Sequence, residues 1–537
     1  MNIWASKAAL FRRTVVGASL VLVAMFSFGL TRPAVSADVK IGMAAALSSA
    51  DPHYHLLATN MSVLAHIFET LVHQDEQQRP GAGLATSWHL VDPTTWEFEL
   101  RRGVQFHDGG EFTAEDVAFS LHRVPLVPNS PSSFAIYLKG IVSCEIVDAH
   151  KVRLHTNGPL PNLPINLSLI AIMSAHAAAG SAPEGATTQQ LNSGQGTIGT
   201  GPYRFVSFVP GDHIVLARNP QYWGGEEPWE HVTITAITNG ASRTAALLAG
   251  DIDVAEKLVG DDLPRVNASP GAVAIVAASN SVSYIELDQA REPSPGVSGG
   301  TGKNPMRDVR VRHALSLALN REALSERIMG GLGEPASELA SPVMFGAARL
   351  KPSPFDPELA KQLLAEAGYP DGFALVLAST KGFYVQDAQM AQAIASYWTR
   401  IGVKTTVEAL PPSNYYSRRN NNEFSAFYQS SSIMTGQAAD LLPIVVGTRD
   451  PARGSGQINF AGYSNPTVDS LIDQASRTVD DPARAALVQQ AGRIVYTEDY
   501  AVLPIYVERV AYGVRKPLVF TPRADKWITA MQIRPPN

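Results

Sequence analysis

The sequence predicts an α/β protein built from more than one domain. Strands and helices alternate through the second half of the chain, where a strand over residues 373–378, a helix over 386–400 and a strand over 403–410 form a β-α-β unit. Such a unit joins parallel strands of a sheet whose two faces are covered. A single core would be unusual for a chain of 537 residues, so we expect two or three domains.

Residues 84–123 are the most informative stretch of the first half. The segment Trp96–Arg101 alternates apolar and charged side chains, which predicts a strand with one buried and one wet face. A glycine-containing turn follows, and Thr113 is placed to cap a helix that begins at Ala114. We therefore expect strand, turn and capped helix here, all serving as scaffold.

A series of motifs follows one another along the chain. They are Ser87-Trp88, Trp96-x-Phe98-x-Leu100-Arg101, Gly103-Val104-x-Phe106-His107-Asp108-Gly109, Phe112-Thr113-Ala114-x-Asp116-Val117, Gly199-Thr200-Gly201-Pro202-Tyr203-Arg204-Phe205, Arg218-Asn219-Pro220-x-Tyr222-Trp223, Asp308-Val309-Arg310-x-Arg312-x-Ala314-Leu315 and Tyr463-Ser464-Asn465-Pro466. As a set they resemble the signature of the family 5 bacterial extracellular solute-binding proteins, which serve dipeptide, oligopeptide, nickel and related ABC importers. The resemblance spans nearly all of the chain after residue 38.

That resemblance implies a two-lobed periplasmic-binding-protein fold of type II, cluster C-like, with an extra α/β subdomain and two hinge strands. The crossings between lobes are expected near Ser281–Asp288 and Leu503–Glu508. A ligand in the cleft would shut the lobes, because it contacts both only when they are closed. The expected division is residues 38–80, 200–280 and 504–537 in lobe I, 81–199 in the extra subdomain, and 281–503 in lobe II.

The first 37 residues are typical of a secretory signal peptide. Basic residues precede an apolar run over 14–30, and Val35-Ser36-Ala37 supplies small residues for cleavage after Ala37. General secretion is favoured over twin-arginine export at Arg12-Arg13, and an uncleaved anchor is the alternative. We therefore expect a mature protein in the periplasm, and a monomer.

Charge and cysteine content exclude several classes of protein. The formal net charge is −6, and removal of the four basic residues of the signal would leave −10, which disfavours nucleic-acid binding. Cys144 is the only cysteine, so no internal disulfide can form, and a buried, inert thiol in a strand is expected for it. No cofactor is expected.

The resemblance also bears on the ligand. In peptide-binding relatives an aspartate near the end of the strand after the β-α-β unit pairs with the ligand's ammonium group. Here that strand is expected over Phe424–Gln429, and Met434 falls at the aspartate's place. Asp440 lies six residues later and would need a different loop path to substitute. Arg419 falls where oligopeptide-binding members have a basic residue, so it either meets a carboxylate or is a solvated charge at a helix end.

Polar and aromatic side chains are expected to line the cleft. Hydroxyl and amide groups suit neutral, hydroxyl-rich or amide ligands, and aromatic rings offer stacking surface. A His-x-His metal pair is disfavoured because no third ligand stands at a suitable spacing. The candidate ligand-binding residues are His53, Tyr54, Asn60, Tyr384, Arg419, Gln429, Ser430, Ser431, Ser432 and Met434.

Three functions remain open on the sequence. The first is capture of a peptide or similar small polar solute and its delivery to the permease subunits of an ABC importer, with an opine, sugar conjugate or oligosaccharide as the alternative ligand. The second is a secreted hydrolase, although no nucleophile, base and orienting group can be placed together. The third is a chemoreceptor or chaperone-like partner, which the same fold could host.

Overall fold

The computed structural model describes residues 38–178, 185–300 and 302–536. All of the family motifs lie within these ranges. The predicted signal peptide and its cleavage after Ala37 lie outside the described residues.

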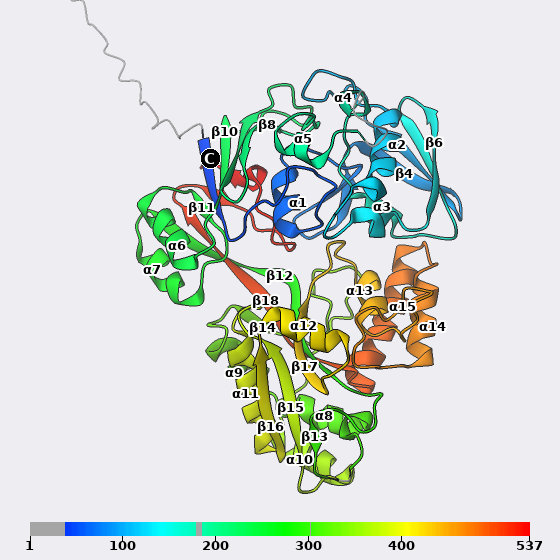
Figure 1. The fold of residues 1–537 in the computed structure, drawn as a ribbon, viewed down its shortest axis with the longest axis vertical. Helices are drawn as coiled ribbons and strands as arrows, with labels where there is room; N and C mark the ends of the chain where they lie inside the picture. Colours follow the sequence, from blue (N-terminus) through cyan, green and yellow to red (C-terminus); the bar gives the residue numbers. More distant parts are fainter. Residues whose placement is uncertain (1–37, 179–184, 301, 537) are drawn as a thin grey trace, which may run out of the picture. The chain divides into compact units, whose positions relative to one another are not determined.

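One sheet of 12 strands runs through both halves of the molecule, in the order β13-β15-β17-β12-β18-β11-β1-β10-β9-β8, with β14 added to β18 and β16 to β15. Its two longest strands, β12 (Ala272–Leu287) and β18 (Val502–Arg515), pair antiparallel along most of their length (Figure 1). Ile505 of β18 lies in one hydrophobic cluster and Val514 in another. Each strand therefore serves two cores, which confirms a two-lobed fold joined by two hinge strands.

Lobe I is built on the parallel strand β1, which lies between β10 and β11 in the sheet. Its apolar side chains are buried against α1 and the C-terminal segment, in one cluster that includes Ile41, Phe68 and Ile528. The elements here are β1 (Asp38–Met43), α1 (Ala58–Leu64), α5 (Thr188–Asn192), β8 (Tyr203–Val209), β9 (His213–Arg218), β10 (His231–Ala236), α6 (Gly240–Ala249), β11 (Val254–Ala255), α7 (Leu263–Ala268), β19 (Val519–Phe520) and β20 (Ile533–Arg534).

A second, four-stranded antiparallel sheet of order β4-β5-β7-β6 falls within residues 81–199. The elements are β4 (Ala85–Asp92), β5 (Thr95–Leu100), α2 (Ala114–Arg123), β6 (Ile141–Asp148), β7 (Lys151–Thr156), α3 (Leu163–Leu167) and α4 (Ala175–Ala178), with a separate hairpin of β2 (Val72–Gln74) and β3 (Pro80–Ala82) before them. The division of the chain into domains at the boundaries given above stays a prediction.

The predicted strand, turn and capped helix are present as β5 and α2, with one difference on the strand, and Thr113 and Asp116 form a capping box at the start of the helix. Glu97 on the supposedly wet face is buried, because the Nζ of Lys151 and the Nε of Arg153 bond its two carboxylate oxygens at 3.1 and 2.8 Å. At the start of α2 the carboxylate of Asp116 accepts the backbone amide of Thr113 at 2.8 Å, so the aspartate side chain closes this end of the helix.

The sequence also predicts a helix over Met61–Val72, and the helix found there, α1, is shorter. It begins at Ala58 and ends at Leu64, and the chain then turns into β2. The backbone carbonyl of Ile67 accepts the amide of Gly201 at 2.9 Å, a partner far along the sequence. Such long-range backbone bonds replace the helical ones here, which the local apolar pattern could not indicate.

Lobe II contains the predicted β-α-β unit. Strands β15 and β16 are parallel over their full length and α11 connects them, and β17 is also parallel to β15. The elements are β13 (Val297–Ser298), α8 (Val309–Leu317), α9 (Arg321–Arg327), β14 (Gly333–Pro335), α10 (Pro357–Glu366), β15 (Phe373–Thr380), α11 (Asp387–Arg400), β16 (Val403–Leu410), α12 (Pro412–Asn420), β17 (Ala426–Ser431), α13 (Ala438–Val445), α14 (Pro466–Ala475) and α15 (Asp481–Arg493).

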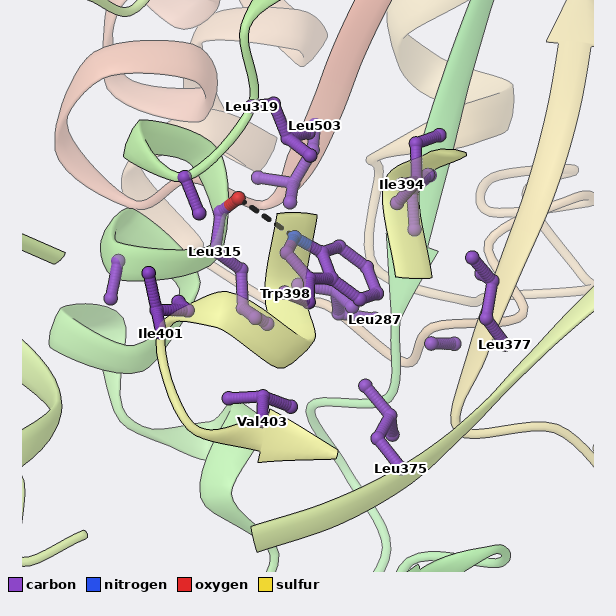
Figure 2. Close-up of a cluster of buried hydrophobic side chains, with 14 of the residues drawn as sticks. Leu287, Leu315, Leu319, Leu375, Leu377, Ile394, Trp398, Ile401, Val403 and Leu503 are labelled. Atoms are coloured by element: carbon purple, nitrogen blue, oxygen red, sulfur yellow. Dashed lines mark hydrogen bonds between the residues drawn. The ribbon is translucent and has the colours of Figure 1, made fainter. Parts of the chain in front are cut away.

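Trp398 of α11 lies at the centre of the lobe II core (Figure 2). It is fully buried, and its indole Nε1 donates to the backbone carbonyl of Leu315 on α8 at 2.9 Å. That bond satisfies the one polar atom of the side chain inside the core, so α8 and α11 are fixed against each other.

Cys144 lies in β6, as expected, and is half-buried. Burial raises the pKa of its thiol to about 11. The thiolate is therefore scarce at neutral pH, which agrees with an inert role.

Candidate ligand-binding site

The carboxyl ends of three parallel strands meet on one side of lobe II. Strand β15 ends at Thr380, β16 at Leu410 and β17 at Ser431. Ligands of open α/β sheets bind outside the carboxyl ends of the strands. The loop 381–386, helix α12 and the end of β17 are therefore the candidate wall of the site on this lobe.

Arg419 lies at the end of α12 and is held in a fixed position. Its guanidinium carbon lies 4.7 Å from the ring centre of Tyr416 and 4.3 Å from that of Phe460. Its Nη1 donates to Oε1 of Gln429, and its Nη2 donates to Oδ1 of Asn420 at 3.0 Å. Among the described residues no carboxylate lies within ion-pair distance of Arg419, so this half-buried cation has room for an anionic partner.

Behind Arg419 lies a buried carboxyl group. The amide Nε2 of Gln429 donates to Oε1 of Glu286, and the backbone amide of Ala461 donates to Oε2 at 3.2 Å. Glu286 is fully buried, and burial raises its pKa to about 8. Gln429 thus links a largely protonated acid to the arginine at neutral pH.

Aromatic side chains surround this polar chain. The hydroxyl groups of Tyr384 and Tyr416 share a hydrogen bond of 2.9 Å. Phe383 packs edge-on against both rings and is itself 56% exposed. The loop 381–386 therefore offers an exposed aromatic edge beside the guanidinium of Arg419.

The three serines lie at the end of β17. Ser430 and Ser431 pair with Ser283 and Val282 of β12 and are half-buried, and Ser432 is exposed just beyond the strand. The strand was predicted over Phe424–Gln429 and is shifted two residues along the chain. Ser430 and Ser431 are therefore part of the sheet, next to the hinge strand β12.

Met434 lies where lobe II meets lobe I. Its backbone carbonyl accepts the side-chain amides of Gln74 and Gln78 at 3.1 and 2.8 Å. Its side chain packs against the hydrophobic cluster of the four-stranded sheet region in lobe I. Met434 supplies no anion to a ligand's ammonium group, and it holds the two lobes together.

Asp440 lies on α13 and contacts residues of both lobes. Its Oδ1 accepts the side-chain amide of Asn162 in lobe I, and its Oδ2 accepts the hydroxyl of Thr435 at 2.6 Å. Burial raises the pKa of this carboxyl. Both oxygens are occupied, so Asp440 bridges the lobes where it could otherwise have paired with a ligand.

His53 lies in the interior of lobe I. Its Nδ1 contacts Nη1 of Arg123 at 3.1 Å, and its Nε2 contacts the backbone carbonyl of Ala171 at 2.8 Å. Arg123 also forms a two-oxygen ion pair with Asp51. Burial lowers the pKa of His53 to about 4, so the ring is neutral and both nitrogens are engaged. Tyr54, which follows it, is half-buried and packs edge-on against His55.

Asn60 lies on the wall of a cavity inside lobe I. The cavity has a volume of about 390 Å³, and all of its described lining residues belong to lobe I, including His55, Met61 and Phe134. The side-chain amide of Asn60 is already bonded to Ser48 and to the carbonyl of Ser49.

The structure thus brings Tyr384, Arg419 and Gln429 together, with Glu286 behind them. Tyr54 and Asn60 lie on lobe I, and no contact within the described ranges joins them to that group. Glu286 was missed because it lies in an apolar strand pattern, where a charged residue is normally assigned to the wet face. Its position in the hinge strand β12, which carries no other charged residue, was the only signal.

The described ranges contain neither a metal-binding cluster nor a membrane-spanning helix. No group of three or more histidine, cysteine, aspartate or glutamate side chains there could hold a metal ion. No helix in the same part of the chain is both long and apolar enough to span a bilayer.

Comparison with known proteins gives the family. Residues 79–451 match the family described as bacterial extracellular solute-binding proteins, family 5 Middle. The chain belongs to this family. Heme-binding protein A of Haemophilus influenzae is 29% identical over 445 residues, 77% of each chain, and the glutathione-binding protein GsiB of Salmonella choleraesuis is 26% identical over 487 residues, 89% of this chain and 90% of that one. Among solved structures, HbpA2 from Haemophilus parasuis matches with a TM-score of 0.78 and 22% identity, over 93% of this chain and 99% of that one.

This family 5 protein is therefore a solute-binding protein of the kind that serves ABC importers. Its relatives of this length are named as binding proteins and carry no enzymatic name. The two-lobed fold that the motifs predicted is confirmed, and the residues that hold the ligand remain a prediction.

Proposed function

We propose that the protein captures a small polar solute bearing a carboxylate, a peptide or a similar molecule, between its lobes and delivers it to the permease of an ABC importer. The observation that carries this proposal is the position of Arg419, whose guanidinium is half-exposed beside the carboxyl ends of three parallel strands and has no carboxylate partner among the described residues. A buried or half-buried arginine held in this way binds carboxylates through charge-assisted hydrogen bonds.

The neighbours of Arg419 favour an anionic guest. Tyr416 and Phe460 both pack against the guanidinium and restrict its orientation. Glu286 could compete for the positive charge, but the pKa of about 8 that its burial causes keeps it mostly neutral at pH 7. A ligand carboxylate therefore meets the cation with little competition.

The same wall offers no anion to a ligand's ammonium group among the described residues. Met434 stands at the place of the aspartate that peptide-binding relatives use, and Asp440 is occupied by Asn162 and Thr435. A non-peptide acid such as an opine or a sugar conjugate is therefore a second candidate, favoured by this missing anion. The names of the relatives, heme-binding and glutathione-binding, show that the family's ligands vary.

The remaining parts of the proposal concern the protein's surroundings. We place it in the periplasm after cleavage of residues 1–37, as a monomer that meets permease subunits only when its lobes are closed on ligand. The proposed domain boundaries are those given from the sequence. A hydrolase is disfavoured, because Glu286, the group of the polar chain Arg419–Gln429–Glu286 that could act as a nucleophile, is fully buried and mostly protonated at neutral pH.

Mass spectrometry of the protein purified without denaturation tests this proposal. The expected result is an additional mass that corresponds to a carboxylate-bearing solute, retained by Arg418→Gln and lost in Arg419→Gln. Arg418 is the matched control, since it is the neighbouring residue of the same helix and is already paired with Glu408 and Glu423. A guest without an acidic group, or one that the protein converts to products, would contradict the proposal.

A further inference from the structure

The cavity inside lobe I is formed by segments that are far apart in the sequence. Loop and helix residues from 52–83, the turn at 222–227 and the C-terminal segment 523–532 all contribute to its wall. Its volume of about 390 Å³ lies in the range of about 300–1,000 Å³ that is usual for small-molecule sites. No described residue of lobe II lines it, and Gln74 of the wall bonds the backbone carbonyl of Met434 in lobe II.

The wall is largely apolar and aromatic. The largest apolar contributors are Met61, Leu64, Phe68, Phe134, Trp223 and Trp527. Rings of this size supply most of the contact area in sites for flat organic molecules. The body of a guest in this cavity would therefore be apolar.

Glu69 is a carboxyl group on this wall that forms no ion pair. Its two oxygens accept hydrogen bonds from Thr200, Tyr222 and Trp223, at 2.7, 3.0 and 2.8 Å. No lysine, arginine or histidine among the described residues lies within ion-pair distance of it. Arg101, whose guanidinium carbon lies 4.0 Å from the ring centre of Trp223, offsets its charge only in part. Burial raises the pKa of Glu69, because the three hydrogen-bond donors and Arg101 offset its loss of water only in part.

Gln74 provides a second acceptor on the same wall. It is only 5% exposed, and its Nε2 donates to Ser168 and to the carbonyl of Met434. Its Oε1 has no hydrogen-bond partner among the described residues. A buried acceptor without a partner is costly, and a donor on a guest would satisfy it.

The arginine on the described wall is neutralised. Arg523 makes a two-oxygen ion pair with Asp525, at 3.0 and 2.6 Å. His73, also on the wall, has its pKa lowered by burial and is therefore mainly neutral at pH 7. The cavity is thus apolar, rich in hydrogen-bond acceptors and short of positive charge.

We propose that this lobe I cavity is a second ligand site, separate from the interlobe site, and that it binds a small amine with an aromatic or apolar body. The ammonium group would supply the missing counter-charge to Glu69 and donors to acceptors such as Oε1 of Gln74. The aromatic body would pack against Phe68, Trp223 and Trp527. This inference goes beyond solute import, because all described lining residues of the site belong to lobe I.

Calorimetric titration with two matched probes tests the proposal. Tryptamine and tryptophol share the indole body, and tryptophol carries a hydroxyl in place of the ammonium group. The expected result is one-to-one binding of tryptamine that is at least tenfold tighter than that of tryptophol. Equal binding of the two probes, or no binding of tryptamine at millimolar concentration, would overturn the proposal.

Four variants locate the binding. Glu69→Gln and Ala82→Trp are expected to weaken tryptamine binding tenfold or more, the first by removing the charge and the second by filling the cavity from an exposed position on its rim. Glu230→Gln removes an exposed carboxylate that does not line the cavity, and Arg419→Gln alters the interlobe wall; both are expected to bind tryptamine like the unchanged protein. If Glu69→Gln fails to fold, Ala82→Trp still tests whether tryptamine binds in the lobe I cavity. Loss of binding in Arg419→Gln, or full binding in Ala82→Trp, would refute a separate lobe I site.

Discussion

The buried carboxyl of Glu286 predicts how the stability of the protein depends on pH. Burial raises its pKa from the ordinary value of 4.5 to about 8 in the folded protein. Between these two values the folded protein holds a proton that the unfolded chain has released. The stabilisation is therefore complete below pH 4.5 and is lost as the pH rises toward 8, so the free energy of unfolding should fall over this window.

The magnitude follows from the linkage relation. Each pH unit between the two pKa values changes the free energy of unfolding by about 1.4 kcal/mol for one proton. Buried histidines such as His53 and His66, whose pKa burial lowers to about 4, act with the opposite sign, but only below about pH 6.5. From about pH 6.5 to 8 the contribution of Glu286 alone is a loss of about 2 kcal/mol.

Urea unfolding at several pH values from about 6.5 to 8 measures this slope. The unchanged protein should lose about 2 kcal/mol more than Glu286→Gln over this window, because the amide cannot ionise. Glu408→Gln, at a half-exposed position paired with Arg418, is the control and should retain the slope. Equal slopes in the unchanged protein and in Glu286→Gln would refute the assignment of a raised pKa to Glu286. Proton uptake on unfolding, measured by calorimetry in two buffers, gives a second measure if the variant is unstable.

Three further predictions concern the ligand, the core and the contact between lobes. Arg419→Gln should weaken binding of the carboxylate ligand about 10- to 100-fold by calorimetry, the effect of losing one charged hydrogen-bond donor, and Arg418→Gln should not; similar affinities in the two would exclude Arg419 from the site. Trp398→Phe should lower the free energy of unfolding by about 1–3 kcal/mol, because it leaves the buried carbonyl of Leu315 without its donor. Tyr397→Phe, at the neighbouring position, should lower it less. An unchanged free energy of unfolding in Trp398→Phe would mean that water satisfies the carbonyl. Asn162→Ala should speed amide hydrogen exchange over residues 433–440, because it removes the bond to Asp440. Asn166→Ala on the same helix is the control. Unchanged exchange in Asn162→Ala would show that this bond does not hold the lobes together.

The sequence was sufficient where structure follows from local patterns. Both strands of the β-α-β unit of lobe II begin where they were predicted to begin, and the first ends two residues later than predicted, because apolar periodicity and the glycine at 402 act over short distances. The capped helix at Ala114 was predicted for the same reason. The motifs of the family then gave the two lobes, which no local pattern could have given.

The parts of the site that could not be predicted depend on contacts between distant residues. Asn162 and Asp440 are 278 positions apart, so nothing in the sequence indicated that the aspartate would be occupied. His53 was chosen as a polar residue in a loop, but Arg123 and Asp51 enclose it in the interior. The lobe I cavity is lined in part by the C-terminal segment, which is distant in the sequence from α1, another part of the wall. In each case the role of a residue depends on its contact partner, which is distant in the sequence, and not on the residue type alone.

The two hinge strands show where movement between the lobes can take place. The β12–β18 ladder is regular up to Ala278 and resumes at Val282, with a break in register between them. On each side of this break the paired residues belong to one lobe, so rotation there leaves both ladders intact.

The break is held from both lobes. The backbone amide of Asn280 bonds the carbonyl of Ala524 in lobe I at 2.9 Å, and its side-chain amide bonds the carbonyl of Ile433 in lobe II at 2.9 Å. Gln78 bonds the side chain of Asn280 and the carbonyl of Met434. Rotation at the hinge would therefore first exchange these few side-chain bonds for bonds to water, each worth about 1 kcal/mol net. Because this sum is well below the binding free energy of a micromolar ligand, about 8 kcal/mol, ligand binding can set the angle between the lobes without disturbing either core.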